Sequence, residues 1–349
     1  MIKDEINSKL LGKDVFTDIL GQDATKKQLK SALLVERHVI IQGAPGIGKT
    51  TLAKNVAKLL PPVTVNDCGY NCIAGNAVCP VCKNAGSKDN KVKTKKLDGE
   101  KRFIRIQGSP DLTAEDLIGD IDPIKAMKFG PLSVEAFTPG KIFKANNGVL
   151  FFDELNRCPE KLQNALLQVL EEKKATIGSY DVDIETDFIL IATMNPNDTS
   201  TERLSNVLLD RFDMIYMTYP EDVEIEMKIV KTKGLDLGVL FDDGLLRYCI
   251  SFIHELRDNE NLEQKPSVRA TLGLYERSQA NAKLNGRKHV SFDDIQEAVE
   301  SVLSHRIKLK PSIKYLQDPS KFIQDEFKQF IERNPGFSSM QEKRSTVPG

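Results

Sequence analysis

The sequence predicts an α/β fold, in which helices cover both faces of a parallel sheet, followed by a smaller all-α domain. Short apolar runs alternate with segments of helical periodicity over the first 220 residues. Strands that alternate with helices form parallel sheets, because each helix carries the chain back to the start of the next strand. From about residue 221 the apolar spacing is helical throughout. Residues 333–349 mix Pro, Gly, Ser and charge without periodicity, a pattern typical of disorder.

The strands of this sheet are predicted where apolar runs end at a turn or a polar residue. They lie at 38–41, 103–106, 148–152 and 188–193. Helices are predicted where the apolar period lengthens, at 23–36, 51–60 and 162–172, and Pro61-Pro62 ends the second of these. Two further short runs, 175–177 and 182–184, flank the turn residues 178–181 and predict a hairpin.

Composition indicates a soluble globular chain of two domains and a tail. Of the 349 residues, 40% are hydrophobic and 28% are charged. The 49 basic and 50 acidic residues leave a net charge of −1, so no basic field argues for nucleic acid and no acidic field for a cationic partner. The first residues lack the layout of a secretory signal, and no apolar run approaches the roughly 20 residues of a membrane span. We therefore expect a cytoplasmic protein.

A glycine-rich loop between a predicted strand and a predicted helix matches the phosphate-binding pattern in full. Bare backbone at its glycines lets amide groups converge on a β-phosphate, and the helix that begins near Lys49 directs its positive end at the same oxygens. The Lys49 ammonium adds a charge for the β- and γ-phosphates, and the Thr50 hydroxyl is a ligand for Mg²⁺. The predicted nucleotide-binding residues are Gly43, Ala44, Pro45, Gly46, Ile47, Gly48, Lys49, Thr50 and Thr51.

A carboxylate pair follows the apolar run 149–152, as ATP hydrolysis at such a loop requires. Asp153 at the strand end is predicted to hold the Mg²⁺ shell, and Glu154 to polarise the attacking water. Without the phosphate loop, the pair would read equally well as an acidic helix cap. The two motifs together predict ATP hydrolysis.

Three polar residues further along the chain are less specific signals than these two motifs. Asn195 follows the run 188–193 and either orients a water or only makes an Asn-Pro turn. Arg211 is either a surface cation or a finger donated to a neighbouring subunit's phosphate. Arg269 begins a predicted helix of the second domain, where a solvated charge is the simpler interpretation.

Four of the six cysteines lie within fifteen positions, at Cys68, Cys72, Cys79 and Cys82. In a reducing cytosol such a cluster indicates a metal rather than disulfides. A structural Zn²⁺ is the leading interpretation, with an iron–sulfur cluster, disulfides or free thiols as alternatives. A catalytic zinc is disfavoured, because four thiolates leave no open position. Residues 83–102 carry eight basic and three acidic residues without interleaved aromatics, which predicts a solvated loop rather than a nucleic-acid patch.

Taken in order, these motifs resemble those of an AAA+ ATPase, in the clade of the magnesium-chelatase ATPase subunit and the MoxR-type ATPases. The resemblance runs from about residue 16 to residue 270. Its most specific segments are 19–22 (ILGQ), 43–50, 137–140 (FTPG), 154–159 (ELNRCP), 192–196 (ATMNP), 209–212 (LDRF) and 266–270 (PSVRA).

The resemblance implies roles and domain limits. Asn195 would be sensor 1, Arg211 the arginine finger and Arg269 sensor 2. Residues 1–220 would form the ATPase domain, with a cysteine-rich insertion at 66–102, the clade's second-helix insertion at 108–140 and its hairpin at 174–184. A helical lid domain would follow at 221–332, and a disordered tail at 333–349.

Members of this clade typically form hexameric rings and remodel a partner, often one with an integrin-like metal-binding domain. This chain has no such domain, so that partner would be a separate protein. The leading hypothesis is therefore a ring-forming ATPase, using MgATP, that reshapes or metallates a protein. The alternatives are a nucleic-acid-associated AAA+ motor, which the near-neutral charge disfavours, and a nucleotide-dependent binding module, which Glu154 disfavours.

Overall fold

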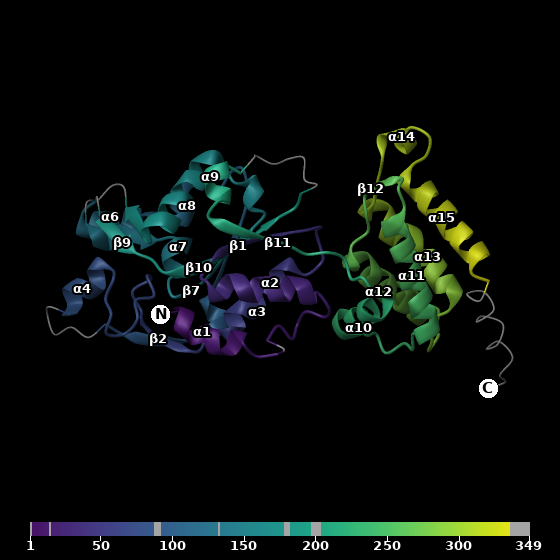
Figure 1. The fold of residues 1–349 in the computed structure, drawn as a ribbon, viewed down its shortest axis with the longest axis horizontal. Helices are drawn as coiled ribbons and strands as arrows, with labels where there is room; N and C mark the ends of the chain where they lie inside the picture. The colour runs from purple at the N-terminus through teal and green to yellow at the C-terminus, as the bar shows by residue number, and fades with distance from the viewer. Residues whose placement is uncertain are drawn as a thin grey trace. The chain divides into compact units, whose positions relative to one another are not determined.

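The computed structural model describes residues 2–13, 15–86, 92–131, 133–177, 182–196 and 204–335 (Figure 1). Contacts between Cα atoms divide the chain into two compact units. The first consists of residues 1–43 and 48–217, and the second of residues 44–47 and 218–349.

The first unit is built on a five-stranded sheet with the strand order β11-β1-β10-β7-β4, in which all neighbours are parallel. The strands are β1 (His38–Gln42), β4 (Phe103–Gln107), β7 (Gly148–Asp153), β10 (Phe188–Met194) and β11 (Phe212–Tyr216). The central strands are apolar along most of their length because both faces of a parallel sheet are buried. The four predicted strands are confirmed, whereas β11 was not predicted.

Helices cover both faces of this sheet, as predicted (Figure 1). Parallel crossovers are right-handed, so the direction in which the chain crosses the sheet decides which face a helix covers. The helices on one face are α1 (Ile2–Leu10), α2 (Asp23–Leu34) and α3 (Lys49–Leu59). Those on the other face are α7 (Lys141–Lys144), α8 (Glu160–Glu172) and α9 (Asn206–Leu209).

The first unit also contains small antiparallel sheets of two strands each. The first pairs β2 (Val63–Asn66) with β3 (Thr94–Leu97), and α4 (Pro80–Gly86) lies between them in the chain. The prediction of a solvated loop over 83–102 was therefore wrong in part. The segment contains β3 and the 3₁₀ helix η1 (Gly99–Arg102), whose Arg102 is buried and donates to the carbonyls of Pro61 and Asn147.

The predicted insertion at 108–140 forms a second ladder, β5 (Gly119–Ile121) with β6 (Phe137–Pro139). Its short helices are α5 (Ala114–Leu117), α6 (Pro123–Phe129) and η2 (Val134–Ala136). A third ladder pairs β8 (Lys174–Ile177) with β9 (Val182–Glu185), as predicted, and the predicted turn 178–181 lies outside the described residues. The 3₁₀ helix η3 (Leu155–Arg157) follows β7.

The second unit is a helical bundle with a core of apolar side chains from all of its long helices. Its helices are α10 (Val223–Lys233), α11 (Asp243–Asp258), α12 (Val268–Leu284), α13 (Phe292–Leu303), α14 (Pro311–Lys314), α15 (Pro319–Arg333) and the 3₁₀ helix η4 (Ser304–Arg306). The prediction of an all-α pattern missed one short ladder, β12 (Leu262–Gln264) with β13 (Lys308–Leu309). Of the predicted disordered tail, residues 336–349 lie outside the described residues. Within the part of the chain that the structure describes, no helix is both long and apolar enough to cross a bilayer.

Candidate functional site

The glycine-rich loop leaves the sheet at the carboxyl end of β1 and leads into α3. Gly46 and Gly48 have φ angles of 76° and 104°, in the left-handed region that side chains disfavour, so these two positions require glycine. The Gly43 amide donates to the carbonyl of Met194 on β10, at 3.2 Å, which fixes the start of the loop to the sheet. The Lys49 ammonium donates to the Gly43 carbonyl, so its side chain folds back over the loop.

The carboxylate pair lies at the carboxyl end of β7, next to β10. The Thr193 hydroxyl donates to Asp153 Oδ1 at 2.6 Å and accepts the backbone N–H of Glu154 at 2.9 Å. Glu154 itself has a φ of 57° and turns the chain sharply out of the strand. One β10 hydroxyl thus orients both residues of the pair. Thr193 was not predicted as part of the site.

Strand β4 contributes two further contacts from the other side of β7. Arg105 donates to Asp153 Oδ2 at 2.6 Å, and the Gln107 amide donates to Glu154 Oε2 at 3.0 Å. The same Glu154 oxygen lies 3.3 Å from the Arg157 guanidinium. Neither β4 residue was predicted as part of the site, although Gln107 follows a predicted strand and pairs in register with Asp153. That position at a shared strand edge was the available signal.

Asn195 directly follows β10, which lies between β1 and β7 in the sheet. Gln42 of β1 pairs in register with Met194 of β10, and Phe152 of β7 pairs with Ala192. At the carboxyl ends of these three strands, which form one edge of the sheet, lie the phosphate loop, the carboxylate pair and Asn195. This edge gathers a glycine loop, a lysine, two carboxylates and an amide from three adjacent strands.

Arg211 lies at the amino ends of the strands, the edge of the sheet opposite the phosphate loop. It precedes β11, whose first residue, Phe212, pairs with His38 at the start of β1. Its guanidinium donates to Glu171 at the end of α8 and to Asp210, and the Glu171 hydrogen bond raises the pKa of Arg211. Arg211 is thus held on the surface by two carboxylates, away from the phosphate loop of its own chain.

Arg269 lies in the second unit, in the first turn of α12. The side chain of Ser267 caps this helix by accepting the backbone N–H of Arg269, at 3.3 Å. The backbone of Arg269 is therefore fixed at the start of the helix.

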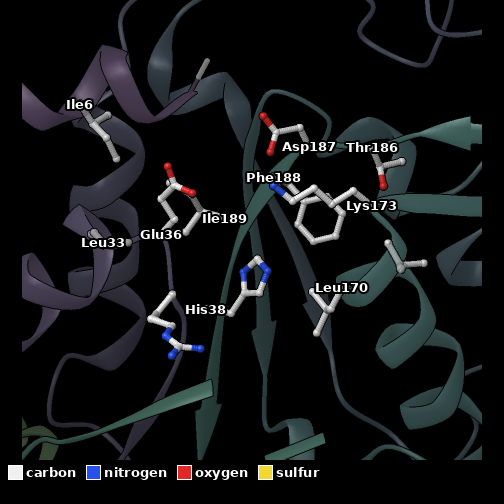
Figure 2. A pocket seen from close by; sticks show the side chains of 12 residues that line it. Ile6, Leu33, Glu36, His38, Leu170, Lys173, Thr186, Asp187, Phe188 and Ile189 are labelled. Atoms are coloured by element: carbon white, nitrogen blue, oxygen red, sulfur yellow. The ribbon is translucent and has the colours of Figure 1, made fainter. Parts of the chain in front are cut away.

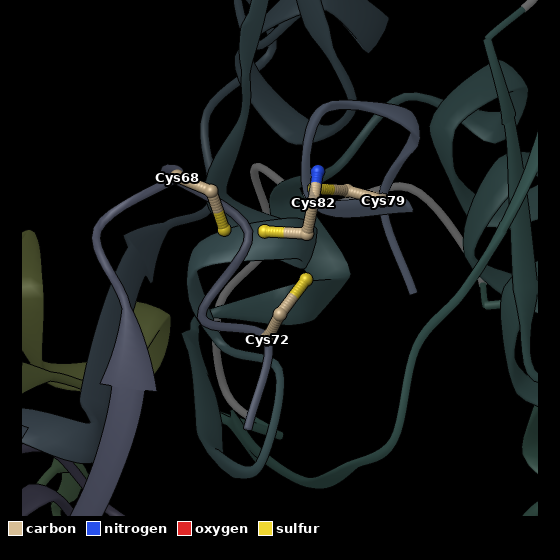
Figure 3. A group of neighbouring side chains, drawn as sticks. All are labelled: Cys68, Cys72, Cys79 and Cys82. Atoms are coloured by element: carbon tan, nitrogen blue, oxygen red, sulfur yellow. The ribbon is translucent and has the colours of Figure 1, made fainter. Parts of the chain in front are cut away.

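The four clustered cysteines converge on one point, as Figure 3 shows. Their sulfur atoms all lie within 4.8 Å of one another, and the side chains of Cys72, Cys79 and Cys82 are buried. A tetrahedral zinc with Zn–S bonds of about 2.3 Å places its sulfurs roughly 3.8 Å apart, so this spacing fits. Two N–H groups point at sulfur: Asn66 Nδ2 lies 3.3 Å from Cys82 Sγ, and the Cys82 amide 3.4 Å from Cys79 Sγ. Such donors suit thiolates that hold a metal.

The loop between Cys68 and Cys72 is docked on the turn before β7. Asn146 Nδ2 donates to the Tyr70 carbonyl at 3.3 Å, and Asn147 Nδ2 to the Asn71 carbonyl at 3.1 Å. The Tyr70 ring packs on Phe143, with ring centroids 5.1 Å apart. The cysteine cluster is therefore attached to the strand that ends in Asp153.

A small cavity of about 60 Å³ lies at the edge of the sheet opposite the phosphate loop (Figure 2). His38 lines it, and its Nδ1 accepts the Leu190 backbone N–H at 3.1 Å. Burial, with a smaller contribution from Lys173, lowers the pKa of His38 to about 4, so the imidazole is neutral near pH 7. This cavity is too small for a nucleotide, and its histidine has a structural role.

The parallel sheet, the glycine-rich loop after β1 and the acidic pair after β7, two strands away in the sheet, define a P-loop ATPase. Three protein-family models match the sequence. "ATPase family associated with various cellular activities (AAA)" matches residues 86–214, "AAA lid domain" residues 254–326, and "Magnesium chelatase, subunit ChlI" residues 15–96.

Similar proteins point the same way. The magnesium-chelatase subunit ChlI homolog of Methanocaldococcus jannaschii is 29% identical, over 85% of this chain and 86% of its own length. The chaperone MoxR1 of Mycobacterium tuberculosis is 25% identical, over 83% of this chain and 73% of its own. A solved structure of a mutant RuvB from Thermotoga maritima has a TM-score of 0.50 and 18% identity, over 83% of this chain and 73% of that one, and supports the fold alone. Together, the family models and these relatives support an AAA+ ATPase of the magnesium-chelatase ChlI and MoxR type.

Proposed function

We propose that the chain binds MgATP with residues 43–51 and hydrolyses it as a subunit of a hexameric ring, in order to remodel or metallate a protein partner. The observation that carries this proposal is the convergence at one sheet edge of the phosphate loop, Asp153, Glu154 and Asn195. Phosphoryl transfer needs positioned cations, a metal shell and an oriented water, and these residue types supply each of them.

In this proposal the loop holds the phosphates through backbone amides, and Lys49 contributes its charge to the β- and γ-phosphates. Thr50 and Asp153 offer the hard oxygen ligands that Mg²⁺ prefers, and Asp153 is held in orientation by Thr193 and Arg105. Bound Mg²⁺ would neutralise charge on the phosphate oxygens. Asp153 is thereby a metal ligand rather than a proton acceptor.

Glu154 is the proposed general base. Gln107 and Arg157 hold its carboxylate at the carboxyl end of β7, and the Thr193 hydroxyl holds its backbone N–H. A carboxylate positioned in this way draws a proton from water as the water attacks the γ-phosphate. Asn195, on the next strand, orients that water with its amide.

Arg211 is the proposed finger for the neighbouring subunit. It sits at the sheet edge opposite its own phosphate loop, so a charge in this place serves catalysis only across a subunit boundary. A ring in which each subunit faces its neighbour in the same orientation supplies one finger to every site. Arg269 is proposed to sense the nucleotide from the second unit.

The partner is proposed to be a separate protein, in keeping with relatives named as a chaperone and as chelatase subunits. The resemblance of the motifs points to a partner with an integrin-like domain. Nucleic acid is disfavoured, because the chain's charges nearly cancel. The four cysteines are proposed to hold a structural Zn²⁺ that ties the insertion together, since their sulfur atoms converge, three of the four are buried, and two N–H groups point at the sulfurs.

The proposal is tested by measuring ATP turnover with proteins captured from the native cell on the Glu154→Gln variant, and in parallel with DNA and with RNA. We expect a captured protein to change the turnover of the unmodified chain several-fold, while nucleic acid leaves it unchanged. Stimulation by DNA or RNA alone would contradict the protein-partner proposal and favour a nucleic-acid motor.

A further inference from the structure

A buried ion pair in the second unit joins α10 to α11. Glu226 is fully buried, and its two carboxylate oxygens accept both terminal nitrogens of Arg257, at 2.6 and 2.8 Å. His254 Nε2 lies 2.8 Å from the same carboxylate. Burial alone would raise the pKa of Glu226, but the hydrogen bonds from Arg257 and His254 lower it to about 2. The pair is therefore fully charged at neutral pH.

The ion pair holds the chain on both sides of Arg269. Arg257 Nε donates to the carbonyl of Pro266 at 2.9 Å, three residues before Arg269. The Thr271 hydroxyl, two residues after Arg269, donates to Glu226 Oε1. The start of α12 is thus fixed by one charged pair from two other helices.

The same arginine also contacts the segment at which the second unit begins. The Arg257 guanidinium lies over the Tyr219 ring, 4.8 Å from its centroid, and the Tyr219 hydroxyl donates to the Lys265 carbonyl at 3.4 Å. Tyr219 is two residues beyond Met217, the last residue of the first unit. Arg257 therefore links this connecting segment to the start of α12.

Stability alone is a poor explanation for this arrangement. A buried ion pair costs much of its attraction in lost hydration, and an apolar replacement of the same shape is often equally stable. What an apolar replacement cannot do is hold the Pro266 carbonyl, the Thr271 hydroxyl and the Tyr219 ring in one fixed geometry. The contacts therefore indicate a positioning role.

We propose that the Glu226–Arg257 pair is the positioning device for Arg269, fixing the first turn of α12 against the connecting segment so that the Arg269 guanidinium acts on bound nucleotide. This inference rests on the proposed nucleotide-sensing role of Arg269. Glu226 and Arg257 do not touch nucleotide; they act through the helix start.

The test is a double-mutant cycle between Arg257→Lys and Arg269→Ala. Lysine keeps the charge beside Glu226 but lacks the fork that reaches Glu226 and Pro266 together. We expect Arg257→Lys to lower kcat/KM for ATP by roughly 10- to 100-fold, because small displacements of a positioned group carry losses of this size. In the Arg269→Ala background the same change should cost almost nothing, since its target is already gone. If Arg257→Lys fails to fold, the isosteric Glu226→Gln takes its place in the cycle.

The matched control is Arg287→Lys. Arg287 pairs with buried Asp294 at the start of α13 in the same unit, but that pair holds no residue next to Arg269. It should lower the Tm without lowering kcat/KM. Equal losses from Arg257→Lys in both backgrounds, or no loss in the unmodified background, would overturn the positioning role while leaving the ATPase proposal intact. A silent Arg269→Ala would instead refute the sensing role of Arg269, and the inference with it.

Discussion

Arg211 gives the sharpest prediction about assembly, because its own chain holds it away from its own phosphate loop. Phe212 pairs with His38, so Arg211 is level with residue 37, six residues before Gly43 along β1. At about 3.3 Å per residue this is a separation of roughly 20 Å, well beyond the reach of an arginine side chain. An Arg211→Ala chain should therefore keep its own loop intact and disable only its neighbour's site.

The expected size of the rescue follows from counting interfaces. An arginine finger contributes roughly 10³- to 10⁵-fold to turnover, so rings of Arg211→Ala alone should be nearly inactive. Rings of Lys49→Ala alone should be equally inactive, since no site holds ATP properly. In an equal mixture that assembles at random, about a quarter of interfaces join an intact loop to an intact finger. Activity should rise at least 100-fold above either variant, toward a quarter of the unmodified value.

The assay is steady-state phosphate release across a range of mixing ratios, with mixed rings verified by native mass spectrometry. The control replaces the Lys49→Ala chain with a Lys49→Ala/Arg211→Ala double variant, which supplies no finger and should rescue nothing. Mixed rings that form but stay inactive at every ratio would refute the assignment of Arg211 across the subunit boundary.

Three further outcomes follow from the site and its supports. Lys49→Ala should weaken ATP binding by roughly 10- to 100-fold, because a charge-assisted contact to phosphate is lost; an unchanged Kd in equilibrium titration would contradict the role of this lysine. Cys79→Ser should abolish an expected one zinc per chain in native mass spectra and speed proteolysis within residues 66–86, whereas Cys249→Ser in the second unit should do neither. A metal-free chain purified under reducing conditions, with that segment equally protected, would rule zinc out, and a visible absorbance would favour iron–sulfur. Because the folded pKa of His38, about 4, lies below its unfolded value of 6.5, its contribution to stability is complete above pH 6.5 and is lost as the pH falls toward 4. Unfolding at pH 5 should therefore cost about 2 kcal/mol less than at pH 7.5 on account of this group, and His38→Asn should flatten that part of the profile; an unchanged slope would refute the assignment.

Much of the fold could be predicted because the central strands are buried on both faces and therefore read as unbroken apolar runs. Strand β11 was not predicted because it is an edge strand, in which Asp213 interrupts the apolar residues. Strand β3 was not predicted for a related reason. Its lysines face solvent on a two-stranded ladder, so the sequence shows no apolar period there.

The candidate site, like the fold, could be predicted only where its residues form a local sequence pattern. The loop at 43–50 and the Asp153–Glu154 pair are local patterns, visible in a few consecutive residues. The contacts of Thr193, Arg105 and Gln107 with that pair depend on strand register, which one sequence does not specify. The pairing of Glu226 with Arg257 depends on how helices pack, and so does not show in sequence spacing. The roles of Asn195, Arg211 and Arg269 stay predictions.

The proposed role of Glu154, to activate the water that attacks ATP, is tested most directly by comparing ATP binding with ATP turnover in Glu154→Gln. The amide keeps the size of the side chain while removing the base, and Lys49, Thr50 and Asp153 stay in place. We expect the Kd for MgATP to change by less than about threefold, and kcat to fall by roughly 10²- to 10⁴-fold, the usual contribution of a general base. Glu172→Gln, at an exposed position near the end of α8, is the matched control and should leave both quantities unchanged. Turnover at the normal rate in Glu154→Gln would show that Glu154 is not the general base.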